Sequence, residues 1–74
     1  MAKYIIQRKF KLMGGKHDYQ YVSSIDNKAQ PTGYDKLEYA LKLTEWQSVR
    51  VLSFLNSIGA EYEAIQVDYN GYIV

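Results

Sequence analysis

The sequence contains no cysteine, a single proline, a single histidine and no long apolar run. These absences exclude several kinds of structure and site. Without cysteine it has no disulfides and no thiolate metal sites, as expected in a reducing compartment. No stretch approaches the roughly 18 apolar residues of a membrane-spanning helix. The opening residues, MAKYIIQRKF, lack the apolar centre of a secretory signal. We therefore expect a cytoplasmic protein that does not enter membranes.

The net charge of the chain is also small. Its 74 residues predict a single domain, 1–74, and carry a net charge of +1, which argues against a strongly basic nucleic-acid binder. Residues 1–37 hold seven Lys/Arg and three Asp, whereas residues 38–74 hold two Lys/Arg and five Asp/Glu. This asymmetry indicates either a polarised surface or two halves that pair with each other in the fold.

Two alternating segments around a glycine pair predict a β-hairpin. Residues 3–12 alternate with their even positions apolar, apart from Arg8, and residues 17–25 alternate again. Between them, Gly14-Gly15 suits a two-residue primed turn, because such a turn needs positive φ at its central residues. We expect the Arg8 guanidinium to stack on a tyrosine or to reach the rim of the sheet.

A two-residue turn fixes the register of this hairpin. Phe10 would pair with Tyr19, and Lys11 would pair with Asp18 on the other face. In this arrangement Lys9 and Lys11 lie on the face opposite Tyr19. The alternation is then explained by folding, and lysines and tyrosines do not share one surface.

The second half of the chain predicts one helix and further strands. Residues 26–36 read as a polar loop, and residues 37–43 fit either a strand or a helix, with an extended segment favoured. Thr44 and Gln47 have the spacing of a capping box for a helix over 45–58. Gly59 suits the left-handed residue that follows a helix.

A strand over 61–69 follows, and Asn70-Gly71 predicts a tight turn into a short edge strand at 72–74. The fold class is therefore α+β: a small, largely antiparallel β-sheet with one helix packed on one face, in the order β-β-(β)-α-β-β. A right-handed crossover places the post-helix strand beside the first strand.

The sequence offers no group of residues that predicts catalysis, a metal site or a cofactor. His17 and Asp18 are neighbours in a strand, so their side chains point to opposite faces and do not form a base with its orienting carboxylate. Gly14-Gly15-Lys16 lacks the earlier glycine, the Ser/Thr and the helix of a phosphate-binding loop. We expect a protein that is not an enzyme.

The leading hypothesis is a protein-interaction module. If the helix covers the even face of the first strand, the other face carries exposed apolar side chains, which mark a contact with a partner protein or with a second copy. Aromatic side chains near the polar loop and on the outer side of the helix, near Arg50, would anchor the partner. The candidate contact residues are Trp46, Tyr34, Tyr39, Ile5, Val22 and Tyr62.

The second hypothesis is a weak nucleic-acid-binding protein. Its candidate residues are Lys3, Lys9, Lys11 and Lys16, on one sheet face and at the turn. The expected separation of these lysines from Tyr19 and the dilution of their charge by Asp18 place this hypothesis second. A salt titration separates the two, because phosphate contacts weaken steeply with ionic strength.

Residues 35–49, 54–59 and 61–67, with the opening KYII at 3–6, include the patterns ALKLT at 40–44 and YEAIQV at 62–67. In these patterns the chain resembles short accessory proteins of phages and prophages of Gram-positive bacteria, over about two-thirds of its length. Trp46 departs from the small or acidic residues usual at its position. The resemblance implies a non-enzymatic protein of the bacterial cytoplasm, and some similar proteins bind and inhibit host or defence proteins, including CRISPR effectors. The shared positions are structural, so no functional residue is carried over.

Overall fold

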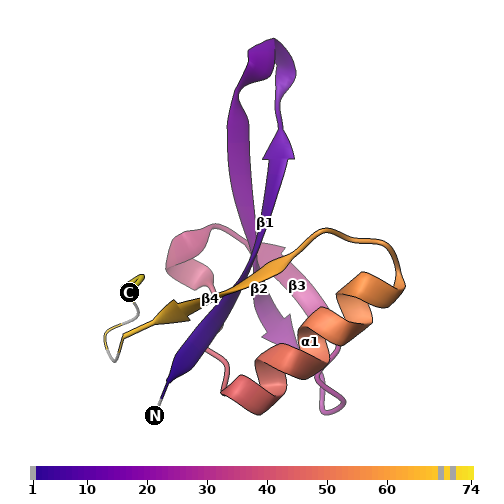
Figure 1. Cartoon of the computed structure of the whole chain (residues 1–74), viewed down its shortest axis with the longest axis vertical. Coiled ribbons are helices and arrows are strands. Elements are labelled where there is room, and N and C mark those ends of the chain that lie inside the picture. Colours follow the sequence, from indigo (N-terminus) through magenta and orange to yellow (C-terminus); the bar gives the residue numbers. More distant parts are fainter. Residues whose placement is uncertain (1, 69, 71) are drawn as a thin grey trace.

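The structure is a computed structural model that describes residues 2–68, 70 and 72–74. These residues form an antiparallel sheet with one α-helix on one face, which confirms the predicted α+β fold (Figure 1). In chain order the elements are β1 (Lys3–Lys11), η1 (Met13–Gly15), β2 (His17–Ile25), β3 (Pro31–Asp35), η2 (Leu37–Tyr39), α1 (Glu45–Ser57) and β4 (Glu63–Val67), where η marks a 3₁₀ turn.

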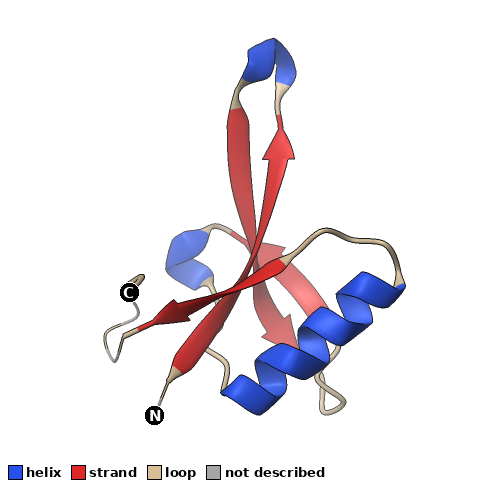
Figure 2. Ribbon diagram, in the orientation of Figure 1, coloured by secondary structure: helices blue, strands red, loops and turns tan. Residues whose placement is uncertain are grey.

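The strands lie in the order β3-β2-β1-β4, and each neighbouring pair is antiparallel. The placement of β4 beside β1 matches the prediction. β1 pairs with β4 over Lys3–Gln7 and with β2 over Gln7–Lys11, whereas β2 pairs with β3 over Tyr21–Ile25. Residues 8–20 therefore extend beyond the rest of the sheet as a two-stranded hairpin, here called the ribbon, which projects from the body (Figures 1 and 2).

The predicted register of the ribbon is wrong by one residue. Lys9 pairs with Tyr19 and Phe10 with Asp18, because the loop contains three residues, Met13–Gly15, rather than two. The Leu12 N–H donates to the Lys16 carbonyl at 2.7 Å and closes this loop. Residues directly opposite each other in an antiparallel pair share a face. Lys9 and Tyr19 therefore lie on the same face, contrary to the expectation.

Of two other predictions between the hairpin and the helix, one is wrong and one is wrong in its first three residues. The expected polar loop at 26–36 contains β3, an edge strand that begins at the only proline, Pro31. Proline is tolerated there because the first residue of an edge strand has no ladder bond to donate. The segment expected to be extended over 37–43 begins instead with the 3₁₀ turn η2; after it Ala40 is extended, and Leu43 forms an antiparallel bridge with Tyr4.

The helix prediction is confirmed at both ends. The Thr44 hydroxyl accepts the Gln47 N–H at 3.2 Å, and the Gln47 side chain accepts the Thr44 N–H at 3.0 Å, forming the capping box. At the other end Gly59 has φ of 79°, and Ala60 N–H donates to the Leu55 carbonyl at 2.9 Å, which ends α1 in a Schellman motif. In the part of the chain that the structure describes, no helix is long and apolar enough to cross a membrane.

The main core lies between α1 and the even face of β1. Its buried members are Ile6, Val22, Ala29, Leu43, Val51 and Leu55, and Tyr62 packs against them in a partly buried position. The prediction that Val22 and Tyr62 lie on the open sheet face is therefore wrong. The one-residue register shift is the cause for Val22, because it moves even-numbered residues of β2 to the helix side.

A second, smaller core lies on the other face of the sheet. Ile5, Tyr21 and Val67 are buried there, with Ala40 and Ile65 packed against them. Ile5 does lie on the face away from the helix, as predicted, but only 2% of it is exposed. Ala40 reaches this core from the segment after η2, and the next residue is tied to β2 by the Leu41 N–H, which donates to the Val22 carbonyl at 2.9 Å. The face expected to be open is therefore partly covered.

The chain returns to β4 near its C-terminal end. Ile73 forms an isolated bridge with Val67, in place of the predicted edge strand over 72–74. The Asp68 carboxylate accepts the N–H groups of Asn70 and Tyr72, each at 2.9 Å, and so holds both residues beside the end of β4. The end of the predicted strand at Tyr69 and the Gly71 position of the predicted tight turn lie outside the described residues.

Candidate functional site

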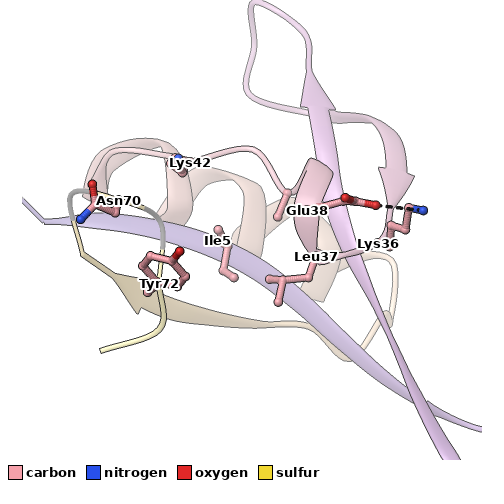
Figure 3. A pocket seen from close by; sticks show the side chains of 8 residues that line it. Ile5, Lys36, Leu37, Glu38, Lys42, Asn70 and Tyr72 are labelled. Atoms are coloured by element: carbon pink, nitrogen blue, oxygen red, sulfur yellow. Dashed lines mark ion pairs between the residues drawn. The ribbon is translucent and has the colours of Figure 1, made fainter.

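A groove of about 540 Å³ lies on the sheet face away from α1, between η2 and the C-terminal residues. Ile5 lies between Leu37 on one side and Tyr72 on the other (Figure 3). Ala40 adds a further apolar surface, and the remaining lining residues are Lys36, Glu38, Lys42 and Asn70. The groove thus has an apolar centre and a polar rim, the composition of many binding sites.

Local backbone contacts position the two walls of the groove. The Ala40 N–H donates to the Leu37 carbonyl at 3.0 Å, which closes the 3₁₀ turn and presents Leu37 and Tyr39 to solvent. On the other side the Asp68 N–H donates to the Tyr72 carbonyl at 2.8 Å, so the Asp68 turn places the Tyr72 ring over the sheet. Both walls are therefore built by short turns rather than by regular strands.

The charges on the rim are partly paired with each other. Lys36 Nζ lies 2.9 Å from Glu38 Oε1, and 5.6 Å from the centre of the Tyr39 ring. Both charged side chains are more than half exposed, so the ion pair itself contributes at most about 1 kcal/mol to stability. Its effect is to hold an ammonium group over Tyr39, which is 57% exposed beside the groove.

Trp46 lies in the first turn of α1 and is 64% exposed. The Arg50 guanidinium carbon lies 5.1 Å from the centre of its ring, which confirms the prediction that Trp46 lies near Arg50. Thr44, Glu45, Trp46, Ala2 and Lys3 line a second hollow of about 490 Å³. Trp46 is therefore available for contact, at a hollow distinct from the groove.

Tyr34 and Tyr62 meet although they come from β3 and from the segment before β4. Their ring centres are 5.9 Å apart, and the Arg8 guanidinium carbon lies 5.9 Å from the centre of the Tyr62 ring. Burial, with a contribution from Tyr62, raises the pKa of the Tyr34 phenol, and Arg8 acts in the opposite direction. The expected stacking of Arg8 on a tyrosine is confirmed, and the tyrosine is Tyr62.

The structure thus separates the predicted contact residues. Trp46, Tyr34 and Tyr39 are exposed at three places, Tyr62 packs beneath Arg8, and Ile5 and Val22 are buried. A contact formed jointly by Ile5, Val22 and Tyr62, including a homodimer on that surface, does not fit this fold.

The predicted lysines are separated as well. Lys3 lies beside Trp46 at the start of β1, whereas Lys9 lies in the ribbon, about 20 Å further along the strand at 3.3 Å per residue. Lys16 follows the loop, and the backbone of Lys11 pairs with His17. The four lysines therefore do not form one patch, but three of them belong to the ribbon.

Sequence patterns missed the groove. Leu37 lies in the segment that fits either a strand or a helix, and Tyr72 lies in a predicted edge strand, and neither pattern predicts a contact with a partner. The signal that was available is Asp68, which lies two residues before Asn70, a spacing typical of an Asx-turn that redirects the chain.

Two further findings bear on the function: the search for metal-binding groups among the described residues, and the comparison of the chain with known proteins. In the described residues, 2–68, 70 and 72–74, no three His, Asp or Glu side chains are grouped to hold a metal ion. No protein-family model, curated protein or solved structure matches this chain. The function is therefore argued from the geometry of the groove and of the ribbon.

Proposed function

We propose that this chain is a non-enzymatic protein-interaction module, and that the groove between Leu37 and Tyr72 receives an apolar side chain of its partner. The observation that carries the proposal is the placement of Ile5 between these two exposed side chains (Figure 3). An apolar anchor from a partner would bury Leu37 and Tyr72 together, and buried anchors of this kind carry most of the energy of an interface.

Tyr39 and Trp46 extend this contact surface. Each aromatic ring has a cation above it, Lys36 and Arg50 respectively. Tyr, Trp and Arg are the residue types most enriched among the residues that dominate binding energy. Tyr39 adjoins the groove and is the nearer contact; Trp46 is the candidate for a second one.

The class of partner that we propose is a bacterial host or defence protein, such as a CRISPR effector, with the chain as a phage- or prophage-encoded accessory protein. Support for this class is the resemblance of residues 3–6, 40–44 and 62–67 to such accessory proteins. A bacterial cytoplasm is the compartment that this proposal requires.

Affinity capture from a Gram-positive bacterial lysate tests the proposal. The baits are the wild type, the double variant Leu37→Ala/Tyr72→Ala, and Val49→Ala, which removes an exposed apolar side chain from α1. We expect a protein that binds the wild type and Val49→Ala but not the groove variant, with retention that changes little with salt. Equal capture by all three baits would contradict a role for the groove.

A further inference from the structure

The ribbon carries most of the positive charge of the chain. Residues 8–20 contain four cationic residues (Arg8, Lys9, Lys11 and Lys16) and one carboxylate (Asp18), a net charge of +3. The rest of the chain contains five cationic residues and seven carboxylates, a net charge of −2. A negatively charged ligand is therefore attracted to the ribbon and repelled by the body.

Among the described residues, the ribbon contacts the body only near its base, where Arg8 lies over Tyr62 and Lys9 lines a hollow with Asn56 and Glu61. The β1–β4 ladder ends at Gln7 and the β2–β3 ladder ends at Tyr21, so beyond this pair the backbone ladder consists of two strands (Figure 1). At the tip, Leu12 is 45% and Met13 is 98% exposed. Beyond this base, the shape lets a ligand approach the ribbon from both faces and from its end.

Cationic and aromatic side chains are interleaved on the ribbon. Lys9 lies directly opposite Tyr19 on one face, both exposed, and His17 lies further along the same face. Arg8 lies on the other face, opposite Gln20. This arrangement removes one of the two reasons for placing nucleic-acid binding second, the separation of Lys9 from Tyr19. The other reason, the negative charge of Asp18, is included in the net charge of +3.

We propose that the ribbon is a second binding site, separate from the groove, that binds double-stranded DNA by lying in its major groove. The major groove is about 12 Å wide and admits a two-stranded β-ribbon, whose strands are about 4.8 Å apart. Lys9, Arg8 and Lys16 then face phosphates, because cationic side chains lie on both faces and beside the tip. Leu12 and Met13 contact the apolar methyl groups of thymine.

A duplex fits these observations better than a single strand does. Proteins that bind single strands stack successive bases on several aromatic side chains of one surface. The ribbon divides its three aromatic rings between its faces, Phe10 on one and Tyr19 with His17 on the other, since Phe10 pairs with Asp18 and Tyr19 with Lys9. It therefore lacks a continuous stacking surface but has cations on both sides.

Fluorescence anisotropy with a short labelled duplex tests this site. The variant is Lys9→Ala/Lys16→Ala, and the matched control is Lys28→Gln/Ser53→Glu, at exposed positions of the body. Each double variant lowers the net charge by two. We expect weak wild-type binding, with a slope of log K against log salt of about −3 over about 50–200 mM salt. The ribbon variant should reduce the magnitude of that slope by about 2, and the control should leave the slope close to the wild-type value.

Three results would overturn the proposal. One is no binding at the lowest salt concentration, and another is an equal loss of binding in the control, which would assign the effect to net charge. The third is tighter binding of the matching single strand or of polyglutamate, which would identify a single-stranded nucleic acid or an acidic protein as the ligand. Circular dichroism of both variants confirms that they are folded, so loss of the fold does not account for a lost slope.

Discussion

The Tyr21 hydroxyl donates a 3.0 Å hydrogen bond to Gln7 Oε1, at the cross-strand pair where the ribbon leaves the body. Gln7 Nε2 in turn donates to Glu63 Oε1 at 3.3 Å, so one polar chain links β2, β1 and β4. Gln7 and Tyr21 are both buried. Burial, with smaller contributions from Tyr19 and Asp18, raises the pKa of the Tyr21 phenol, a direction that favours the protonated form that donates this bond.

Replacing Tyr21 with Phe should destabilise the protein, because it leaves Gln7 Oε1 buried without its donor. We expect Tyr21→Phe to lower the free energy of unfolding by about 1–2 kcal/mol. Urea denaturation measures the change. Tyr19→Phe is the control, since Tyr19 is exposed and its hydroxyl has access to water. Equal stability of Tyr21→Phe and the wild type would show that this bond does not hold the strands together.

Truncation of Ile5 should reduce stability rather than association. Ile5 is buried against Tyr21 and Val67, so Ile5→Ala removes packed atoms and is expected to cost about 2–4 kcal/mol. Ile73→Ala, at a side chain that is half exposed, should change stability by less than about 0.5 kcal/mol. Denaturation and light scattering are measured together. A change in molar mass without a loss of stability would support the rejected dimer surface.

The loop of the ribbon should require glycine at position 14 because of the backbone conformation there, and not because a larger side chain would clash. Gly14 has φ of 83°, and a Cβ added there meets no heavy atom within 4 Å. Gly14→Ala should therefore cost about 1–2 kcal/mol from the left-handed backbone alone, and Gly14→Asn should cost less. The Leu12 amide, which donates to Lys16, reports local opening by hydrogen exchange. Equal exchange in the Ala and Asn variants would contradict this explanation.

The loop after β2 should respond to pH through Asp26. Its carboxylate accepts the N–H groups of Lys28 and Gln30 at 2.8 and 2.9 Å, and these bonds, that from Gln30 first, lower the pKa of Asp26. Because the pKa of Asp26 is lower in the folded protein, its carboxylate stabilises the fold at pH values above about 3.9, the ordinary pKa of an aspartate. This stabilisation is lost as the pH falls through the pKa of Asp26 in the folded protein.

The variant Asp26→Asn tests this dependence. We expect it to be less stable than the wild type at neutral pH, with a difference that narrows below about pH 4, where the wild-type carboxylate also becomes neutral. Urea denaturation across pH measures this difference, and Glu61→Gln, at another exposed carboxylate, serves as the control. A difference that stays constant from neutral to acidic pH would assign the effect to something other than protonation of Asp26.

The sequence was informative where a local signal has a single structural solution. Thr44, Gln47 and Gly59 have defined roles at helix ends, and α1 begins and ends as they predict. The placement of β4 beside β1 followed from the order of the elements. These features depend on residues close together in the chain or on general rules of connection, which sequence patterns record.

Sequence patterns gave wrong predictions where the same residues are compatible with two different structures. Gly14-Gly15 fits a two-residue turn and also the observed three-residue loop with positive φ at both glycines. The alternation in β2 did not resolve the choice, because Tyr21 and Val22 are both buried, one against each face of the sheet. A strand covered on both faces gives no alternation from which a register is read. The groove was missed for a related reason, since it joins two turns that are far apart in the chain.

The Hα–Hα NOE across the ribbon is the measurement that tests this account most directly. The groove floor at Ile5, the Gln7–Tyr21 bond and the DNA site at Lys9 all depend on one register. We predict a strong NOE between Hα of Lys9 and Hα of Tyr19, which form a non-hydrogen-bonded pair in the observed ladder. A strong NOE between Phe10 and Tyr19 instead would show the two-residue turn, place the lysines and Tyr19 on opposite faces, and contradict the account.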